Sequence, residues 1–258
     1  MSAAIIIPAR YGSSRLTGKP LLNIGGLTML ERVWRIARAV NGVTRIVVCT
    51  EDERIVEHAQ SFGAEAVLTS DRCRNGTERA AETIKVADID ETAIINFQGD
   101  AVLTPPWVIE AMVDEFYTGE GFDIVTPAVE LDDRQLELFK VHKLSAPASG
   151  TTVTFDRARN ALYFSKQIIP FIRTNGVAAV HRHIGLYGYT KEALLRYVTL
   201  PEGPLEKTEG LEQLRALENG MNIRIVVVDY RGRTHGSVDA PEDVPQVEEI
   251  IRREGELV

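Results

Sequence analysis

The chain has 258 residues, and 29 Lys and Arg against 37 Asp and Glu give it a formal net charge of −8. Hydrophobic residues make up 44% and charged residues 26%, which is typical of a soluble globular protein and excludes a disordered or collagen-like chain. The acidic excess disfavours a non-specific grip on nucleic acid or on an anionic membrane. A small anionic ligand stays compatible with this charge wherever positive side chains are gathered locally.

The sequence shows no sign of membrane insertion or export. Residues 3–8 form one of the longest apolar runs, which is far too short to span a bilayer. Met1 leads directly into this run, without the basic segment and cleavage site of a secretion signal. The two cysteines, Cys49 and Cys73, do not have the spacing of metal ligands. We therefore expect reduced thiols in a cytoplasmic protein that binds neither membrane nor nucleic acid.

Up to about residue 122, short apolar runs alternate with segments of helical periodicity. Thr28 and Glu31 have the spacing of a capping box, and Leu30 and Val33 begin the helical pattern that follows. Strands that are apolar throughout and alternate with helices predict a mostly parallel sheet with helices on both faces. The expected strands are 4–7, 45–49, 66–68 and 93–97, and the expected helices start at Thr28 and cover 52–62, 77–86 and 107–117.

Beyond Asp123 the pattern changes to strands joined by longer polar segments, which predicts a smaller antiparallel lobe. The α/β pattern returns near residue 204. We interpret the chain, 1–258, as one unit with a core lobe of 1–122 plus 204–258 and a second lobe of 123–203. The expected elements are strands over 124–129, 151–155, 161–164, 183–189 and 223–228, a helix over 204–219 and a last helix from Pro241.

The loop after the first strand concentrates positive charge. Arg10, Arg15 and Lys19 follow one another closely there, and Gly12 and Gly18 allow the backbone to approach a ligand. Open α/β sheets bind ligands beyond the carboxyl ends of their strands, so this loop is a candidate phosphate site. Its glycine spacing matches neither a P-loop nor a dinucleotide fingerprint. A solvated basic loop is the alternative.

Carboxylates follow two later strands. Asp100 comes directly after an apolar strand and a glycine, and Asp239 lies in an acidic loop that opens the last helix. Such oxygens suit Mg²⁺, although capping of a turn or helix is the alternative for each. Because the cationic loop and both carboxylates are expected at one edge of the sheet, together they predict a site for a nucleoside triphosphate with Mg²⁺.

Taken in order, the motifs resemble those of the CMP-Kdo synthetases, the 3-deoxy-manno-octulosonate cytidylyltransferases. The resemblance runs through almost the whole chain, and it implies a Rossmann-like nucleotidyltransferase fold, a homodimer paired through the middle segment, and the substrates CTP and an acidic acceptor. The matching motifs are residues 7–11, 18–21, 76–79, 98–100, 161–165, 183–189, 211–215 and 238–239.

The resemblance also implies roles for individual residues. Asp100 and Asp239 would hold Mg²⁺, and with Arg10, Arg15 and Lys19 they would form the catalytic set. The nucleotide would contact Pro8, Ala9, Arg10, Lys19, Asn75, Gly76 and Thr77. The acceptor would contact Gln98, Lys166, His183, Tyr187, Glu212 and Gln213.

Several positions depart from the family pattern. Ala101 stands where a Glu is usual, Lys166 where an Arg is usual, and Thr152 where a Lys is usual. Lys166 keeps the charge of arginine but loses its bidentate geometry. These changes have two alternative explanations. Either they are neutral drift, or the acceptor is different: an amino-substituted Kdo, another acidic 2-keto sugar, or a small phosphonate such as phosphonoformate. Smaller departures are Thr17 for Pro, Asn75 for Ser and Ala240 for Thr.

The main prediction is a Mg²⁺-dependent cytidylyltransferase that joins CMP from CTP to an acidic sugar and releases pyrophosphate. We identify no dedicated base, and a metal-bound acceptor hydroxyl is the simplest hypothesis for activation. The alternative outside the enzymes is a homologue that binds a nucleotide without catalysing a reaction. The departures at Ala101, Thr152 and Lys166 are the reason to consider it. An oxidoreductase of the dinucleotide-binding type is disfavoured by the missing glycine fingerprint.

Overall fold

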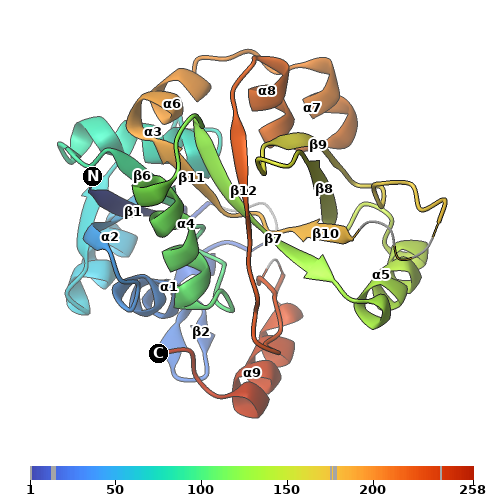
Figure 1. Cartoon of the computed structure of the whole chain (residues 1–258). Helices are drawn as coiled ribbons and strands as arrows, with labels where there is room; N and C mark the ends of the chain where they lie inside the picture. Colours follow the sequence, from blue (N-terminus) through green and yellow to red (C-terminus); the bar gives the residue numbers. More distant parts are fainter. Residues whose placement is uncertain (1, 13–15, 175, 177–178, 239) are drawn as a thin grey trace.

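A computed structural model describes residues 2–12, 16–174, 176, 179–238 and 240–258. Its central feature is one twisted sheet of ten strands, in the order β5–β4–β1–β6–β11–β7–β10–β8–β9, with β12 paired to the other edge of β7 (Figure 1). Helices cover both faces. Among the described residues, no helix is both long enough and apolar enough to cross a membrane.

The half of the sheet formed by the first part of the chain is parallel. It consists of β1 (Ala3–Pro8), β4 (Val43–Thr50), β5 (Glu65–Leu68) and β6 (Ala93–Asn96). Every residue of β1 and β6 is buried, because helices pack on both faces of the strands. The continuous apolar runs therefore predicted these strands correctly.

The other half is largely antiparallel, as predicted for the middle of the chain. β7 (Ile124–Leu131) is its longest strand, and it pairs with β11 (Tyr187–Thr190), with β10 (Val180–His183) and, in parallel, with β12 (Ile223–Val227). β11 also pairs with β6, so the two halves form one sheet. The outermost strands are β8 (Thr151–Phe155) and β9 (Ala161–Ser165).

Two expected elements are divided in the structure. The strand expected over 183–189 is two strands, β10 and β11, because Ile184 to Leu186 leave the ladder and the Thr126 hydroxyl donates to the Leu186 carbonyl at 2.7 Å. The helix expected over 204–219 is α7 (Pro204–Glu209) followed by α8 (Gln213–Glu218). Gly210 separates them in the left-handed region at φ +64, which a glycine adopts readily.

Side-chain caps begin two helices of the first half, and the sequence predicted the first of these caps, at Thr28. Thr28 caps α1 (Met29–Arg38) and Asn75 caps α3 (Gly76–Val86), each side chain accepting from a backbone N–H three residues on. α2 covers Glu53–Ser61 and α4 covers Pro106–Thr118. α1, α2, α4 and α9 (Asp243–Glu254) pack on one face of the sheet, and α3, α8 and α6 (Lys191–Tyr197) on the other.

The pattern did not predict α5 (Asp133–Ser145). Asp132 forms a capping box with Gln135, but Phe139 is the one buried residue of the helix, so its sequence has little apolar periodicity. α6 was also missed. The remaining short elements are a hairpin of β2 (Asn23–Ile24) and β3 (Leu27–Thr28) and the 3₁₀ helix η1 (Lys19–Leu21).

Candidate active site

The ends of β1 and β6 and the start of α3 surround a cavity of about 250 Å³. The loops expected at one edge of the sheet therefore do meet there. The residues that line the cavity include three from the end of β1 and three from the turn after β6. The full set is Pro8, Ala9, Arg10, Lys19, Pro20, Met29, Cys73, Arg74, Asn75, Gly76, Arg79, Gln98, Gly99 and Asp100.

Lys19 and Asp100 form an ion pair inside this cavity. The Lys19 Nζ lies 2.7 Å from the Asp100 Oδ2, and their side chains are 15% and 32% exposed. Lys19 opens η1 directly after Gly18, which takes the left-handed conformation at φ +71. Arg10 is exposed and lines the same cavity, so cationic and anionic groups face one small space.

Two glycines allow the loops to come this close. A Cβ on Gly99 would lie 2.8 Å from the Pro8 carbonyl oxygen, and a Cβ on Gly76 would lie 2.9 Å from the Gln98 Oε1. Real Cβ atoms do not approach other heavy atoms so closely. At Gly99 the contact is with backbone, so a larger residue there would push the end of β1 and the turn after β6 apart. At Gly76 a larger residue would require the Gln98 side chain to move.

A second ion pair, which we did not predict from the sequence, lies beside the cavity. Glu51, directly after β4, accepts a hydrogen bond from the Tyr11 N–H at 2.9 Å and pairs with the Arg79 guanidinium at 2.8 Å. The Arg79 side chain is only 4% exposed and also donates to the Thr69 hydroxyl at 2.5 Å. Arg79 belongs to the motif 76–79, which could have pointed to a role at the site. Nothing in the sequence around Glu51 pointed to such a role.

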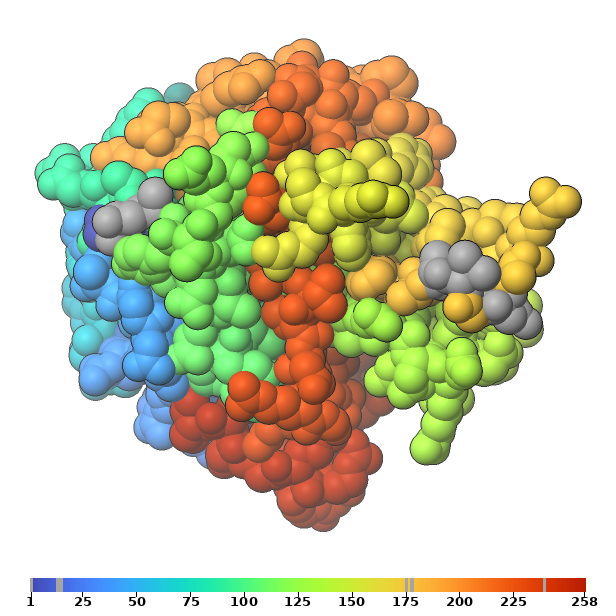
Figure 2. All heavy atoms as spheres, viewed as in Figure 1, coloured from blue at the N-terminus to red at the C-terminus, as the bar shows by residue number. Residues whose placement is uncertain are grey.

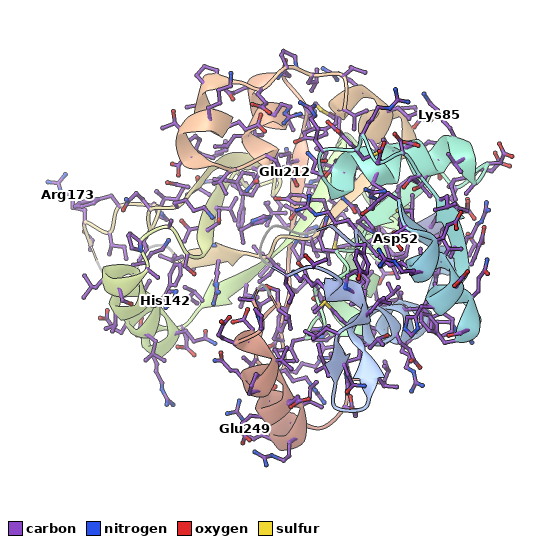
Figure 3. The ribbon with its side chains drawn as sticks, turned by 180° about the vertical axis from the view of Figure 1, so that it is seen from behind. Asp52, Lys85, His142, Arg173, Glu212 and Glu249 are labelled. Atoms are coloured by element: carbon purple, nitrogen blue, oxygen red, sulfur yellow. The ribbon has the colours of Figure 1, made fainter. Side chains whose placement is uncertain are left out.

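Two of the residues expected to contact the acceptor, Gln98 and Glu212, lie next to the first turn of α3. The Thr77 hydroxyl lies 3.4 Å from the Glu212 carboxylate, and the Asn96 side chain donates to Thr77 at 3.3 Å. The Tyr187 hydroxyl donates to the Gln213 Oε1 at 2.9 Å. Figure 3 shows Glu212 between α3 and the pair α7–α8. Thr77, expected near the nucleotide, thus joins the nucleotide and acceptor sides.

Burial sets the protonation of these groups. Burial raises the pKa of Glu212 despite the opposing charge of Arg215, and burial raises the pKa of Tyr187 well above its usual value. Burial, then His235 and Lys166, lowers the pKa of His183 to about 3. The His183 Nε2 lies 2.8 Å from the Thr126 hydroxyl, so this imidazole is neutral and serves as a hydrogen-bonding group at physiological pH.

The similarity of this chain to known proteins identifies the family to which it belongs. Residues 4–223 match the family described as cytidylyltransferase. The chain is 51% identical, over the full length of both chains, to the 3-deoxy-manno-octulosonate cytidylyltransferase of Maricaulis maris. The chain belongs to the cytidylyltransferase family. It is therefore an enzyme of the nucleotidyltransferase class, and the resemblance seen in its motifs is confirmed.

Two further relatives extend the likeness. The 8-amino-3,8-dideoxy-manno-octulosonate cytidylyltransferase of Shewanella pealeana is 40% identical and covers 95% of this chain and 96% of its own. A solved structure of CMP:2-keto-3-deoxy-manno-octonic acid synthetase complexed with CTP superposes with a TM-score of 0.87 at 33% identity. That likeness covers 98% of this chain and 100% of the other, which confirms the nucleotidyltransferase fold.

The described residues of this cytidylyltransferase do not form a closed metal cage. They contain no group of three or more His, Cys, Asp and Glu side chains that could hold a metal ion. Within the described cavity, Asp100 supplies the carboxylate, and it is partly exposed. Mg²⁺ is commonly held by one or two carboxylates together with substrate phosphates, so this donor set fits an ion that arrives with a triphosphate.

Two predicted catalytic residues, Arg15 and Asp239, lie outside the described residues. The segment that leads to position 239 is described as far as Val238, whose N–H donates to the Asp100 carbonyl at 3.3 Å. The third loop of the prediction therefore reaches the same edge of the sheet as the other two.

Two of the departures from the family pattern, Thr152 and Lys166, lie close together, because Thr152 at the start of β8 pairs with Ser165 at the end of β9. Ala101 lies apart from them, in the segment after β6. The Thr152 hydroxyl donates to the Gln167 carbonyl at 2.6 Å and accepts from the Ile169 N–H at 3.1 Å. The Lys166 N–H donates to Glu209, and burial lowers the pKa of the Lys166 ammonium. Thr152 thus orders the segment that carries Lys166. Cys49 and Cys73 are both free, as expected.

Proposed function

We propose that this cytidylyltransferase transfers CMP from CTP to an acidic 2-keto sugar of the Kdo type and releases pyrophosphate. The ion pair of Lys19 and Asp100 in the cavity between β1 and β6 carries the proposal, because it gives one site both a phosphate-binding cation and a metal-binding carboxylate. The activities for which the Maricaulis and Shewanella relatives are named, and the CTP bound to the solved synthetase, support it.

The nucleotide end of the reaction follows from charge. We assign the phosphates of CTP to Arg10, Arg15 and Lys19, and the nucleoside to the 75–77 segment at the start of α3. The acceptor hydroxyl attacks the α-phosphorus in line; the new oxygen–phosphorus bond forms as the bond to the bridging oxygen of pyrophosphate breaks. Lys19 and Arg10 then stabilise the negative charge that grows on the leaving pyrophosphate.

We assign Mg²⁺ to Asp100 and Asp239. When bound there, the ion supplies positive charge to the phosphate oxygens. The contact of Val238 with the Asp100 carbonyl supports this pairing, since it brings the chain on the amino side of residue 239 to Asp100.

The acceptor end uses hydrogen bonds and one cation. We assign the sugar hydroxyls to Gln98, the neutral His183, Tyr187, Glu212 and Gln213, and the sugar carboxylate to Lys166. Tyr187 and Gln213 already hold each other at 2.9 Å, so their polar atoms are oriented before the sugar binds. Relatives named for Kdo and for 8-amino-Kdo stand at 51% and 40% identity, and we propose Kdo as the acceptor with 8-amino-Kdo as the competing candidate.

We also propose that the enzyme is a cytoplasmic homodimer. CTP is a cytoplasmic nucleotide, which supports the location. The outer face of α5 supports self-association, because Leu138, Val141 and Leu144 are 61%, 63% and 86% exposed and form an apolar stripe. α5 stands out from the body of the molecule in Figure 2, at the end of the antiparallel half.

The experiment measures pyrophosphate release from CTP with Mg²⁺ and each of Kdo, 8-amino-Kdo and phosphonoformate, with the nucleotide product identified by mass. We expect turnover of Kdo, and a loss of activity of about a hundredfold or more in Asp100→Asn, because the variant loses a charge beside the phosphates. Asp114→Asn, at an exposed position on α4, is the matched control and keeps wild-type activity.

Three outcomes contradict the proposal or a part of it. Turnover of phosphonoformate without turnover of Kdo or 8-amino-Kdo shows that the enzyme uses a different class of acceptor. CTP binding by calorimetry with no product from any acceptor identifies a non-catalytic homologue. Full activity of Asp100→Asn refutes the metal assignment while leaving the transferase activity in place.

A further inference from the structure

A second cavity lies in the antiparallel half, on the side of the sheet covered by α5. Its volume is about 360 Å³. Figure 1 shows α5 and the chain after β12 on either side of β10, and the cavity lies between them. It shares no lining residue with the nucleotide cavity or with the proposed acceptor contacts. The lining consists of Val129, Leu131, Gln135, Leu138, Phe139, His142, Arg182, Ile184, Tyr230, Arg233 and His235.

The walls of this cavity combine positive charge with apolar surface. Two arginines and two histidines line it, and none of its lining residues is acidic. The remaining surface is mainly aliphatic and aromatic. Its charge is thus opposite in sign to the net charge of −8 of the whole chain, and this local positive charge suits an anion.

Arg182 is the centre of that charge. Its side chain lies on β10 beside the ring of Phe139, with the guanidinium carbon 5.4 Å from the ring centroid. Burial lowers the pKa of Arg182. Within the part of the chain that the structure describes, no carboxylate pairs with it, whereas the buried Arg79 and Arg215 pair with Glu51 and Glu206. A guanidinium removed from water without a partner is costly, and a planar carboxylate would satisfy it with two parallel hydrogen bonds.

His235 supplies a second unsatisfied group. Its Nδ1 is buried and has no hydrogen-bond partner, and its ring meets Tyr230 edge-on with centroids 5.6 Å apart. Burial, with the charge of Arg182, lowers the pKa of His235 to about 4, so the ring is neutral near pH 7. Buried polar atoms are nearly always paired, and an unpaired one that lines a cavity beside an unpaired arginine points to a missing ligand.

We propose that this cavity binds a small carboxylic acid with an apolar body. The carboxylate pairs with Arg182 and accepts a hydrogen bond from His235, and the body packs against Val129, Phe139 and Ile184. Inorganic phosphate fits less well, because the apolar wall offers no donors for its remaining oxygens. The site lies apart from the proposed transferase chemistry and does not depend on it.

The test uses benzoate as the probe, with benzamide as a neutral molecule of the same shape and inorganic phosphate as the second anion. Binding to the full-length enzyme is followed by ligand-observed NMR, with CTP present to occupy the nucleotide cavity. We expect saturable binding of benzoate that CTP does not displace, and binding of benzamide weaker by about tenfold or more.

Variants locate the binding. Arg182→Gln is expected to weaken benzoate binding by about tenfold or more. Arg231→Gln is the matched control, because Arg231 is exposed, stacks on Trp107 and does not line the cavity. Circular dichroism and thermal melting establish that each variant is folded.

Four results overturn the proposal. If benzoate does not bind saturably, the cavity does not bind a carboxylate. If CTP displaces benzoate, the benzoate was bound in the cavity between β1 and β6. Phosphate that binds more tightly than benzoate assigns another class of ligand. A change in the mass of the particle in Arg182→Gln, measured by light scattering, shows that the cavity faces a second copy of the chain.

Discussion

The carboxylate of Glu51 holds two parts of the nucleotide cavity at once. One oxygen fixes the backbone of the cationic loop through the Tyr11 N–H, and the other meets the guanidinium of the buried Arg79. Arg79 belongs to α3, which also presents Gly76 and Thr77. The position of the loop and the position of the helix are therefore coupled through one side chain. Loss of its charge leaves a cation 4% exposed and without its carboxylate.

We predict that Glu51→Gln lowers stability by about 1–3 kcal/mol and raises the KM for CTP several-fold, with a smaller effect on kcat. The amide oxygen can still accept from the Tyr11 N–H, but the amide does not neutralise Arg79. Thermal melting and steady-state kinetics measure the two effects. Glu53→Gln, two residues on at an exposed position in the first turn of α2, is the matched control. An unchanged melting temperature together with an unchanged KM refutes the coupling.

At the scale of elements, the site depends on the contact between the ends of two adjacent strands. β1 ends at Pro8, and the turn after β6 passes so close to it that Gly99 has no room for a side chain. Asp100 follows in the same turn and meets Lys19. The separation of the strand ends therefore sets the distance between the cationic loop and the carboxylate.

We predict that Gly99→Ala separates the strand ends and lowers kcat/KM by about tenfold or more, with a loss of about 1–3 kcal/mol in stability. The penalty is steric, because Gly99 is not among the residues with positive φ. Gly185→Ala is the matched control: Gly185 is exposed and a Cβ there meets nothing within 4 Å. Kinetics and melting of both variants provide the measurement, and equal behaviour of the two refutes the argument.

Local signals explain which elements could be predicted. The apolar runs of β1 and β6 and the cap at Thr28 depend on neighbouring residues, and they appear where expected. α5 could not be predicted because it buries only Phe139 and its stability rests on its cap. Gly210 could have indicated the break between α7 and α8, but the helical pattern on both sides of it predicted one continuous helix.

The same reasoning explains the site. Lys19 and Asp100 were predictable because each follows a strand, and strand ends in a parallel sheet share an edge. The pair of Glu51 and Arg79 was not, because nothing in either local sequence indicates its partner on another element. The cavity beside Arg182 was likewise hidden, since it needs α5, β10 and the chain after β12 in place.

At the scale of the molecule, one sheet joins the two proposed substrate sites. β6 carries the turn to Asp100 at its end and pairs along its side with β11, which begins at Tyr187. Thr77 and Glu212 make a second link between the two sides. Charge is divided in the same way: cations face the nucleotide cavity and the cavity beside Arg182, while the acidic excess lies elsewhere. The net charge of −8 therefore says little about the small anions that the protein can bind.

The apolar stripe of α5 leads to a prediction about assembly. Leu144 is 86% exposed and Val141 63% exposed, and burying two such side chains against a second copy contributes about 2 kcal/mol each. We predict that light scattering after gel filtration gives twice the chain mass of 28.6 kDa, and that Val141→Ser with Leu144→Ser weakens the dimer by about a hundredfold or more. Val86→Ser, on a 48% exposed apolar residue of α3, is the matched control and keeps the dimer. A wild-type chain that elutes as a monomer, or a double variant as dimeric as the control, shows that α5 does not mediate self-association.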